Sequence, residues 1–256
     1  MIEITNKIKK MVSSLDNIKE RKANGLFVAE GTKCVLDTLH HFKLRYLFAT
    51  LDWLCKHNKY VSGLEVTEVK RSDLISMSHL STPPDVLAVY EIPQFALTGT
   101  EANDNLVIAL DCVQDPGNLG TIMRVADWFG INTIVCSNTT VDVFNPKVVQ
   151  STMGAISRVK VVYVDLVDYL RSLKDDIPVY GTFLHGDNIY STPLSANGVV
   201  VMGNEGQGIS DSVAKCVIHR ITIPSYPCDA QTSESLNVGM ATAITVSEFR
   251  RKEMKN

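Results

Sequence analysis

The strongest constraint on this fold is an alternation, from residue 106 onward, of short apolar runs with segments of helical periodicity. The runs are nearly continuous in Val, Ile and Leu, so each predicted strand is apolar on both faces. Strands of this kind, separated by helices, predict an α/β domain with a parallel sheet covered on both faces. The strand-like runs are 106–110, 133–136, 159–164, 179–183, 199–202 and 218–223, and the helical segments are 123–129, 146–152, 166–173 and a closing helix from about 235.

A smaller α/β pattern precedes this one in residues 1–92. Apolar residues recur at helical spacing between Ile4 and Leu15, and strand-like stretches follow. Residues 91–105 contain Pro, Gly and Asn with few large apolar side chains, and we place a linker at 93–105. The chain is long enough for two cores, one in 1–92 and one in 106–256.

The charge distribution points to a possible partner. Residues 1–45 hold nine Lys and Arg against five Asp and Glu, whereas the other 211 residues hold 16 against 23. If the protein binds nucleic acid, the N-terminal stretch is the expected first contact, although a solvated helix face explains the charge equally well. Its basic residues are Lys7, Lys9, Lys10, Lys19, Arg21 and Lys22.

Cysteine spacing and the chain's start exclude several classes. The six cysteines form no C-x-x-C pair, so neither a zinc site nor a disulfide framework is expected. The start lacks the apolar core of a signal peptide, and no apolar run could span a bilayer. We therefore expect a cytoplasmic protein without a metal or a membrane partner.

Three loops follow predicted strands, where open parallel sheets bind ligands. In the first, Gly117 and Gly120 permit tight turns before a helix that carries Arg124. A structural alternative is a well-capped helix with Arg124 paired to Asp127. The second loop, 202–210, has a G-x-x-G-x-G pattern that suggests a close approach of backbone to a ligand; the alternative is a glycine-rich turn with Glu205 merely solvated.

The third loop runs from Ile223 to the closing helix. Ser233 or Ser235 could cap that helix, but capping by a serine does not explain Asn237, which is a mediocre helix former. Each loop has a structural explanation by itself. Together, in this order, the three loops indicate a particular protein family much more specifically than any one loop does.

The chain resembles the SpoU (TrmH-type) branch of the SPOUT RNA methyltransferases. The matching stretches are DPGNLGTIMRVADWFG (115–130), VMGNEGQGIS (201–210) and an Ile-Pro followed by SLNVGMATAI (235–244). LFVAEG (26–31) and STPPDVLAV (81–89) look like the family's ribosomal-protein-like RNA-binding domain. Two departures are a longer SYPCDAQTSE segment between Pro224 and Ser235, and Gly239 where a serine is frequent.

The resemblance implies a parallel-sheet catalytic domain with a C-terminal deep trefoil knot, an exception to the usual unthreaded topology. It implies S-adenosylmethionine bound in that knot at Gly203, Ile223 and Leu236. The implied catalytic residues are Asn118, Arg124, Glu205, Ser235 and Asn237.

The implied reaction moves a methyl group from a sulfonium to a ribose 2′-oxygen, which requires in-line positioning and a more nucleophilic oxygen. A guanidinium stays protonated, so we expect Arg124 to bind the adjacent phosphate and stabilise alkoxide charge, with base action as the second option. Asn118 and Asn237 would fix Arg124 and the ribose, Glu205 would hold the loops or orient Arg124, and Ser235 would place the nucleotide or cap the helix.

The resemblance also implies an RNA partner, ribosomal RNA rather than transfer RNA, and a homodimer. Leu236, Met240, Ile244 and Val246 of the closing helix are the expected interface residues. Two alternatives remain: an NAD oxidoreductase, disfavoured by the absence of G-x-G-x-x-G after the first strand, and a non-catalytic RNA-binding or ribosome-assembly factor on the same fold. Calorimetry with S-adenosylmethionine and NADH separates the three.

Overall fold

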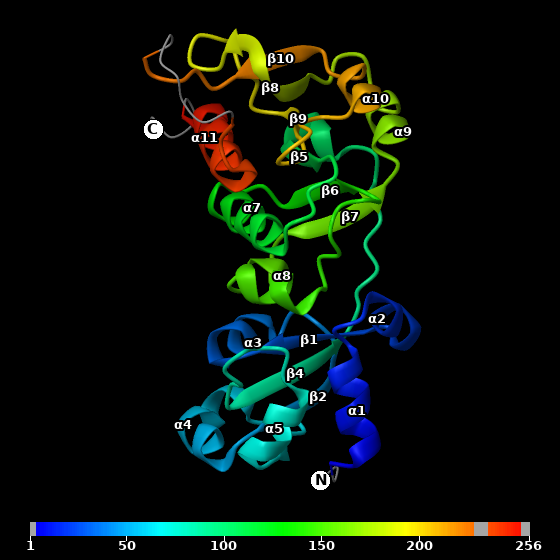
Figure 1. The fold of residues 1–256 in the computed structure, drawn as a ribbon, viewed down its shortest axis with the longest axis vertical. Coiled ribbons are helices and arrows are strands. Elements are labelled where there is room, and N and C mark those ends of the chain that lie inside the picture. The colour runs from blue at the N-terminus through cyan, green and yellow to red at the C-terminus, as the bar shows by residue number, and fades with distance from the viewer. Residues whose placement is uncertain (1–3, 228–234, 252–256) are drawn as a thin grey trace. The chain divides into compact units, whose positions relative to one another are not determined.

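The computed structural model describes residues 4–227 and 235–251 and divides into two compact units (Figure 1). Unit 1 comprises Met1–Gln94 with Asp142–Ser157, and unit 2 comprises Phe95–Val141 with Arg158–Asn256. Within the described residues, no helix has the length and apolar character needed to cross a membrane.

Unit 2 is built on a six-stranded sheet in the order β10-β8-β9-β5-β6-β7. Every neighbouring pair is parallel, which confirms the prediction from the apolar runs. The central strands are buried along their whole length because both faces of the sheet are covered. The strands are β5 (Leu106–Leu110), β6 (Thr133–Ser137), β7 (Lys160–Val164), β8 (Val179–Asn188), β9 (Gly198–Met202) and β10 (His219–Thr222).

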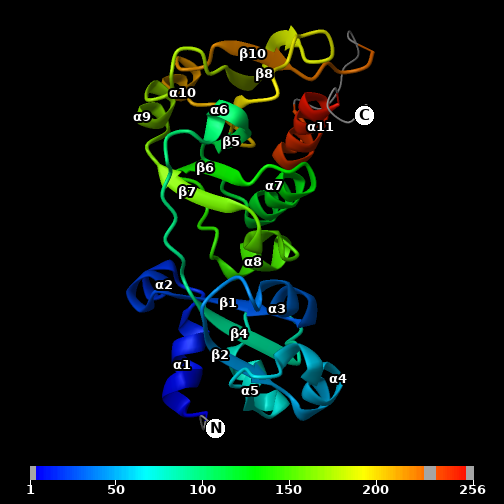
Figure 2. The same cartoon turned by 180° about the vertical axis from the view of Figure 1, so that it is seen from behind.

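Helices cover both sides of this sheet. Helices α7 and α11 pack against each other on one side, and α9 and α10 lie on the other (Figures 1 and 2). Val107, Ala109, Val199 and Val201 of the central strands pack in one cluster with residues of α9 and α10. The helices are α6 (Glu101–Asp104), α7 (Pro116–Trp128), α9 (Leu166–Arg171), α10 (Asp211–Ala214) and α11 (Val238–Arg250).

Unit 1 is a four-stranded sheet in the order β1-β4-β2-β3. Strand β4 is antiparallel to β1 and β2, and β3 is parallel to β2. Val12, Leu15, Leu74 and Met77 from the α1 and α5 regions share one buried cluster with the sheet. The elements are β1 (Leu26–Glu30), β2 (Leu44–Ala49), β3 (Thr67–Glu68), β4 (Val86–Glu91), α1 (Asn6–Ser14), α2 (Ile18–Asn24), α3 (Thr32–Thr38), α4 (Leu51–Val61) and α5 (Arg71–Met77).

The segment Asp142–Ser157 lies with unit 1, although the sequence placed it within 106–256. It contains the predicted helix, α8 (Pro146–Ser151), and the turn η1 (Ala155–Ser157). Its apolar side chains explain the placement: Val148 and Val149 are buried, and the Phe144 ring lies 4.7 Å from that of Phe27 in β1.

We expected Arg21 to be one of the exposed basic residues of the N-terminal stretch. The structure shows that it is buried instead. Its side chain is 2% exposed, and its Nε and Nη2 donate to Oδ2 of Asp142 at 2.9 and 2.6 Å. Its Nη1 donates to the carbonyl oxygens of Leu15 and Asp16, each at 2.7 Å. All of this hydrogen bonding is internal to unit 1, so Arg21 is not available to an RNA phosphate.

Arg21→Ala is expected to lower the free energy of unfolding by about 3 kcal/mol, because it leaves Asp142 and two carbonyl groups without their donor. Urea denaturation measures this loss. Arg21→Lys should recover only part of it, since an ammonium cannot reproduce the planar fork. An unchanged unfolding midpoint in the alanine variant would contradict this account.

A second buried polar group in unit 1 joins His79 to Glu30. The Glu30 carboxylate accepts from the backbone N–H of His79 at 2.9 Å and from its ring Nδ1 at 3.1 Å. Ring Nε2 of His79 donates to the Ser13 carbonyl at 3.0 Å, so both ring nitrogens face acceptors. Burial alone lowers the pKa of His79, but the hydrogen bonds to Glu30 and Ser13 and the charges of Glu30 and Asp16 outweigh it, and the pKa lies above its ordinary 6.5.

This arrangement predicts a pH dependence of stability. Because the folded-state pKa of His79 is raised, its contribution is fully present below 6.5 and is lost as the pH rises through the folded-state value. The free energy of unfolding should therefore fall as the pH rises from about 6.5 through the raised folded-state pKa of His79. His79→Gln should remove that part of the pH dependence; an identical slope in the variant would rule it out.

Candidate functional site

Two of the three predicted loops lie side by side because their strands are neighbours. Strands β5 and β9 pair in parallel with Leu110 opposite Met202, so both chains leave the sheet at the same edge. The loop after β5 leads into α7, and the third predicted loop leads into α11, which packs against α7. All three loops therefore meet around the start of α7 and α11.

Three of the predicted catalytic side chains form one hydrogen-bonded chain. Nδ2 of Asn118 donates to Oε1 of Glu205 at 2.7 Å. Nδ2 of Asn237 donates to Oδ1 of Asn118 at 2.8 Å. Glu205 is therefore not merely solvated. Its carboxylate holds the loop after β9 against the first turn of α7.

Helix caps fix the two asparagines. Oδ1 of Asp115, the N-cap of α7, accepts from the backbone N–H of Asn118 at 2.8 Å. Asn237 is itself the N-cap of α11, and its Oδ1 accepts from the N–H groups of Gly239 and Met240. One Asn237 amide thus caps a helix with its oxygen and reaches Asn118 with its nitrogen, which accounts for an asparagine at this position.

Ser235 is exposed and does not cap α11, because Asn237 occupies the cap position. Ser233, the other serine considered as a cap, lies outside the described residues.

Arg124 lies exposed on α7, apart from this chain of side chains. Asp127, the expected structural partner, instead pairs with Arg158 through two contacts of 2.8 Å. Within residues 4–227 and 235–251, Arg124 makes no hydrogen bond or ion pair. It lies six positions after Asn118, so the two side chains leave the helix roughly 120° apart. Its charge is thus free for an anion.

The structure also identifies two residues that the sequence analysis missed. Oδ2 of Asp111, a buried carboxylate directly after β5, accepts from the N–H of Ser210 at 2.8 Å. Nδ2 of Asn204 donates to the carbonyl of Cys112 at 2.8 Å. Both side chains tie the loops after β5 and β9 together. Their position, immediately after buried strands, was the signal that could have indicated them.

Gly203 is closely surrounded by the backbone of its own loop. A Cβ at this position would lie 2.2 Å from the carbonyl carbon of Gly208 and 2.3 Å from the nitrogen of Ile209. The space is therefore taken by the loop's own backbone, which closes through paired bonds of 2.9 Å between Asn204 and Gly208. The fold of the loop by itself therefore requires a glycine at position 203.

Gly239 permits a close contact between the two helices. A Cβ there would lie 3.0 Å from Cγ2 of Thr121 in α7. The residue departs from the serine that is frequent at this position, and the structure gives a packing reason for the glycine.

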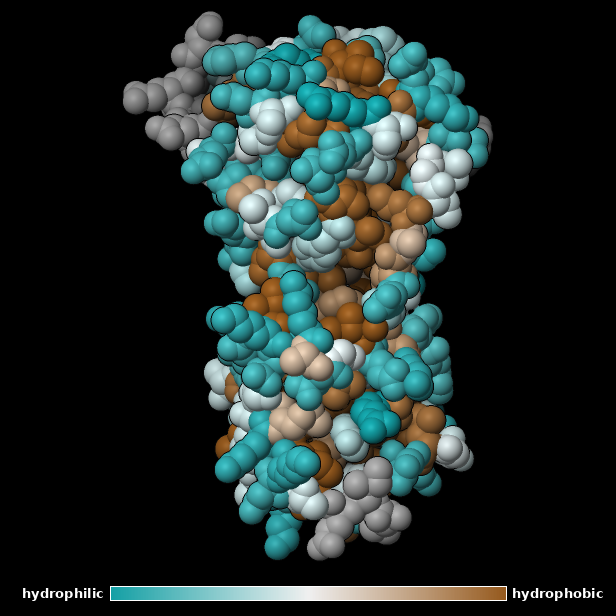
Figure 3. All heavy atoms as spheres, turned by 90° about the vertical axis from the view of Figure 1, so that its right-hand side faces the viewer, coloured by the Kyte–Doolittle hydropathy of each residue, from teal (hydrophilic) through white to brown (hydrophobic). Residues whose placement is uncertain are grey.

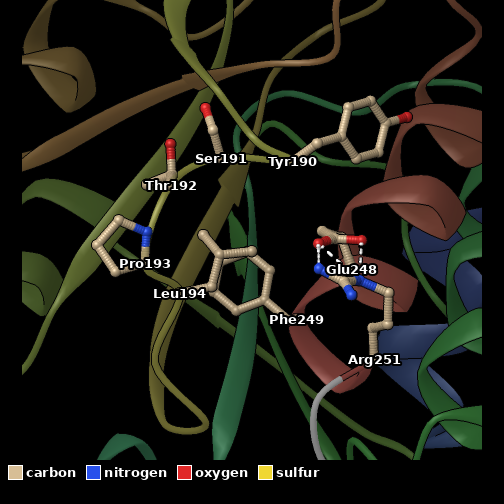
Figure 4. Close-up of a pocket in the computed structure, with 8 residues that line it drawn as sticks. All are labelled: Tyr190, Ser191, Thr192, Pro193, Leu194, Glu248, Phe249 and Arg251. Carbon is tan, nitrogen blue, oxygen red and sulfur yellow. Dashed lines mark hydrogen bonds and ion pairs between the residues drawn. The ribbon is translucent and has the colours of Figure 1, made fainter.

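The three predicted cofactor-binding residues lie at the ends of β9 and β10 and before α11. Gly203 is buried, Ile223 is half-buried, and Leu236 is exposed. A separate pocket of about 180 Å³ lies at the far end of α11 (Figure 4) and contains none of the predicted site residues. There Glu248 already holds the Arg251 guanidinium, so that charge is satisfied.

Comparison with protein families identifies both parts of the chain. A family model described as the SpoU rRNA Methylase family matches residues 105–247, which include the three loops. A second, described as an MRM3-like substrate binding domain, matches residues 5–88. The chain belongs to the SpoU rRNA methylase family.

Named relatives and solved structures agree with this family assignment. The 23S rRNA (guanosine(2553)-2'-O)-methyltransferase RlmP of Bacillus subtilis is 30% identical, over 91% of each chain. A TrmH-family structure from Porphyromonas gingivalis is 38% identical with a TM-score of 0.85, covering 98% of this chain and 100% of that one. An AdoMet-bound rRNA methyltransferase from Sinorhizobium meliloti is 29% identical with a TM-score of 0.86, covering 100% and 98%.

Proposed function

We propose that this SpoU-family chain transfers a methyl group from S-adenosylmethionine to a ribose 2′-hydroxyl of ribosomal RNA. The observation that carries the proposal is the chain of hydrogen bonds from Asn237 through Asn118 to Glu205, at the carboxyl edge of the sheet. The curated relatives named as 23S rRNA 2′-O-methyltransferases support the substrate class. A cytoplasmic location is part of the same proposal.

The residues at the strand ends fit the cofactor. Ile223 and Leu236 leave apolar surface uncovered beside the loops, which suits a purine ring, and the neighbouring backbone can supply polar contacts. Gly203 would contribute through the backbone of the closed loop after β9. When bound, S-adenosylmethionine supplies a methyl carbon that its positive sulfur activates.

The polar side chains supply positioning and charge. Arg124, which is protonated and without a partner among the described residues, would bind the phosphate next to the target ribose and stabilise negative charge on the 2′-oxygen. Asn118 and Asn237 would fix the ribose through neutral hydrogen bonds, while Glu205 holds Asn118 in place. Ser235 would contact the nucleotide. Base action by Arg124 remains the second option.

Unit 1 would bind the RNA. It contains the segment that matches a substrate-binding domain, and we propose that it is the family's ribosomal-protein-like domain. Lys7, Lys10, Lys19 and Lys22 are exposed and would contact phosphates, whereas Lys9 is held by Asp73. Such contacts give salt-dependent affinity without sequence specificity, so the target nucleotide must be selected elsewhere.

The trefoil knot is also part of the proposal. Strand β10 lies at one edge of the sheet beside β8, yet the chain then returns to α11 against α7, which follows β5. This return supports a C-terminal segment that threads past the loop after β9.

We further propose a homodimer that completes the site. On the α7 and α11 side of unit 2, Trp128 is 84% and Met240 is 59% exposed, and Leu236 is also exposed. On the side that carries α9 and α10, apolar side chains are interspersed among hydrophilic ones (Figure 3). Val246, expected at the interface, is instead fully buried within unit 2.

Light scattering at micromolar concentration is expected to give the mass of a dimer. Met240→Glu should shift the equilibrium to monomer, because it places a charge in the apolar contact. Ile75→Glu, an equally exposed apolar residue of unit 1, is the control and should leave the dimer intact. A monomeric wild-type protein would contradict the proposal.

The function itself is tested by comparing 2′-O-methyl marks in ribosomal and transfer RNA from strains with and without the gene. Loss of one ribosomal mark, restored by the purified protein with S-adenosylmethionine, is the expected result. A lost transfer-RNA mark would overturn the substrate class. Calorimetry that detects neither S-adenosylmethionine nor NADH binding would favour a non-catalytic RNA-binding or ribosome-assembly factor.

A further inference from the structure

The residue that connects the loop after β5 to the sheet has an unusual backbone conformation. Cys112 has a φ of 58°, a left-handed region that a side chain with a Cβ rarely adopts. It persists because both of its backbone groups are held. Its N–H donates to Oγ of Ser137 at the end of β6, at 2.9 Å, and its carbonyl accepts from Nδ2 of Asn204 at 2.8 Å.

Asn204 has a second set of contacts, which shape its own loop. Its Oδ1 accepts from the backbone N–H groups of Gly206 and Gln207 at 2.9 and 3.0 Å. One side chain thus uses its oxygen to close the loop after β9 and its nitrogen to hold the loop after β5. The same nitrogen also donates to Oε2 of Glu205 at 3.4 Å. The next residue is Glu205, whose carboxylate holds Asn118.

We propose that Asn204 is a positioning residue for methyl transfer: by tying the carbonyl of Cys112 to the closed loop after β9, it sets the distance at which Glu205 holds Asn118. Asn204 does not itself reach the substrate. The inference rests on the proposed function and deepens it. A misplacement of about 1 Å in such a site costs on the order of 10²-fold in rate.

Asn204→Asp separates the two sets of contacts. An aspartate keeps an acceptor for Gly206 and Gln207 but cannot donate to the carbonyl of Cys112 or to Oε2 of Glu205, which it would repel. Asn204→Ala removes both sets. Asn132→Asp is the matched control, because it makes the same change at the opposite, amino-terminal edge of the sheet, where Oδ1 accepts from Thr133.

In steady-state assays, Asn204→Asp should lower kcat by about 10²-fold while KM for S-adenosylmethionine changes little. Combining it with Asn118→Ala should cost little more than Asn118→Ala alone, because both act through the Glu205 contact. Asn132→Asp should resemble the wild type. Normal turnover in Asn204→Asp, or rate losses that multiply fully in the double variant, would overturn the inference.

Amide hydrogen exchange provides a readout that needs no activity. Ser137 holds the Cys112 N–H, so this amide reports on Asn204 through the strained backbone: once Asn204→Asp releases the Cys112 carbonyl, the residue should leave its left-handed conformation and its amide should exchange faster, while the amides of Gly206 and Gln207 stay protected. In Asn204→Ala all three should exchange faster. Unchanged exchange at Cys112 in both variants would also overturn the inference. A wild-type protein that transfers no methyl group would refute the proposed function, and the exchange pattern would still decide whether Asn204 holds the two loops together.

Discussion

Replacing Arg124 by alanine is expected to reduce methyl transfer by about 10²–10³-fold while leaving the affinity for S-adenosylmethionine nearly unchanged. The residue is exposed on α7 and makes no ion pair with any residue that the structure describes, since Asp127 binds Arg158 instead. Its removal therefore breaks no hydrogen bond or ion pair among the described residues, and the lost charge should act only where a phosphate and a developing alkoxide would lie.

Single-turnover kinetics and calorimetry on the same preparation measure the two quantities separately. Arg124→Lys should rescue weakly, because an ammonium cannot reproduce the planar, two-pronged contact. Arg171→Ala, in α9 on the other side of the sheet, is the control for loss of an exposed arginine. Equal losses of turnover and of cofactor affinity would make Arg124 part of the pocket, and near-normal turnover would remove it from the mechanism.

Gly203→Ala is expected to abolish detectable binding of S-adenosylmethionine. A single methyl group at this position would lie within 2.6 Å of three backbone atoms of Gly208 and Ile209, none of which belongs to a flexible side chain. The loop after β9 would have to open, and Glu205 would move away from Asn118. The loss should therefore extend to turnover, because the same loop presents the backbone for the cofactor and the carboxylate for Asn118.

Gly206→Ala in the same loop is the matched control. A Cβ there would find only Oδ1 of Asn204, at 3.7 Å, which is an ordinary contact. Calorimetry should show near-normal affinity for this variant, and thermal unfolding should confirm that both variants remain folded outside the loop. Normal cofactor affinity in Gly203→Ala would show that the closed loop is not needed for binding.

Much of unit 2 could be predicted from the sequence because its signals are local. Val and Ile fill β5 and β9 without alternation, which is typical of strands buried on both faces, and the parallel sheet follows. The helix starts were predicted less well: we placed the first helix at 123–129 with Gly117 and Gly120 in turns before it, whereas α7 begins at Pro116 because Asp115 caps it. The closing helix begins at Val238 with Asn237, rather than a serine, as its cap.

The hydrogen bonds within the site could not be predicted from local sequence signals. Asn118 is 87 residues from Glu205 and 119 residues from Asn237, so no periodicity relates them. The family resemblance named these residues, but the hydrogen bonds between them depend on β5 and β9 being neighbours and on α11 packing against α7. The same is true of Asn204, which the sequence analysis missed and whose contact with the carbonyl of Cys112 depends on the same pairing of β5 and β9.

Sequence alone thus determined the class of sheet, the three loops at its strand ends and the candidate residues they carry. Tertiary structure alone decided that Arg21 is buried against Asp142, that Asp142–Ser157 joins unit 1, and that Gly203 accommodates its own loop. The physical reason is the range of the forces involved. Propensity, capping and apolar periodicity act over a few residues, whereas burial of a charge or close approach of two backbones is settled only when distant segments pack.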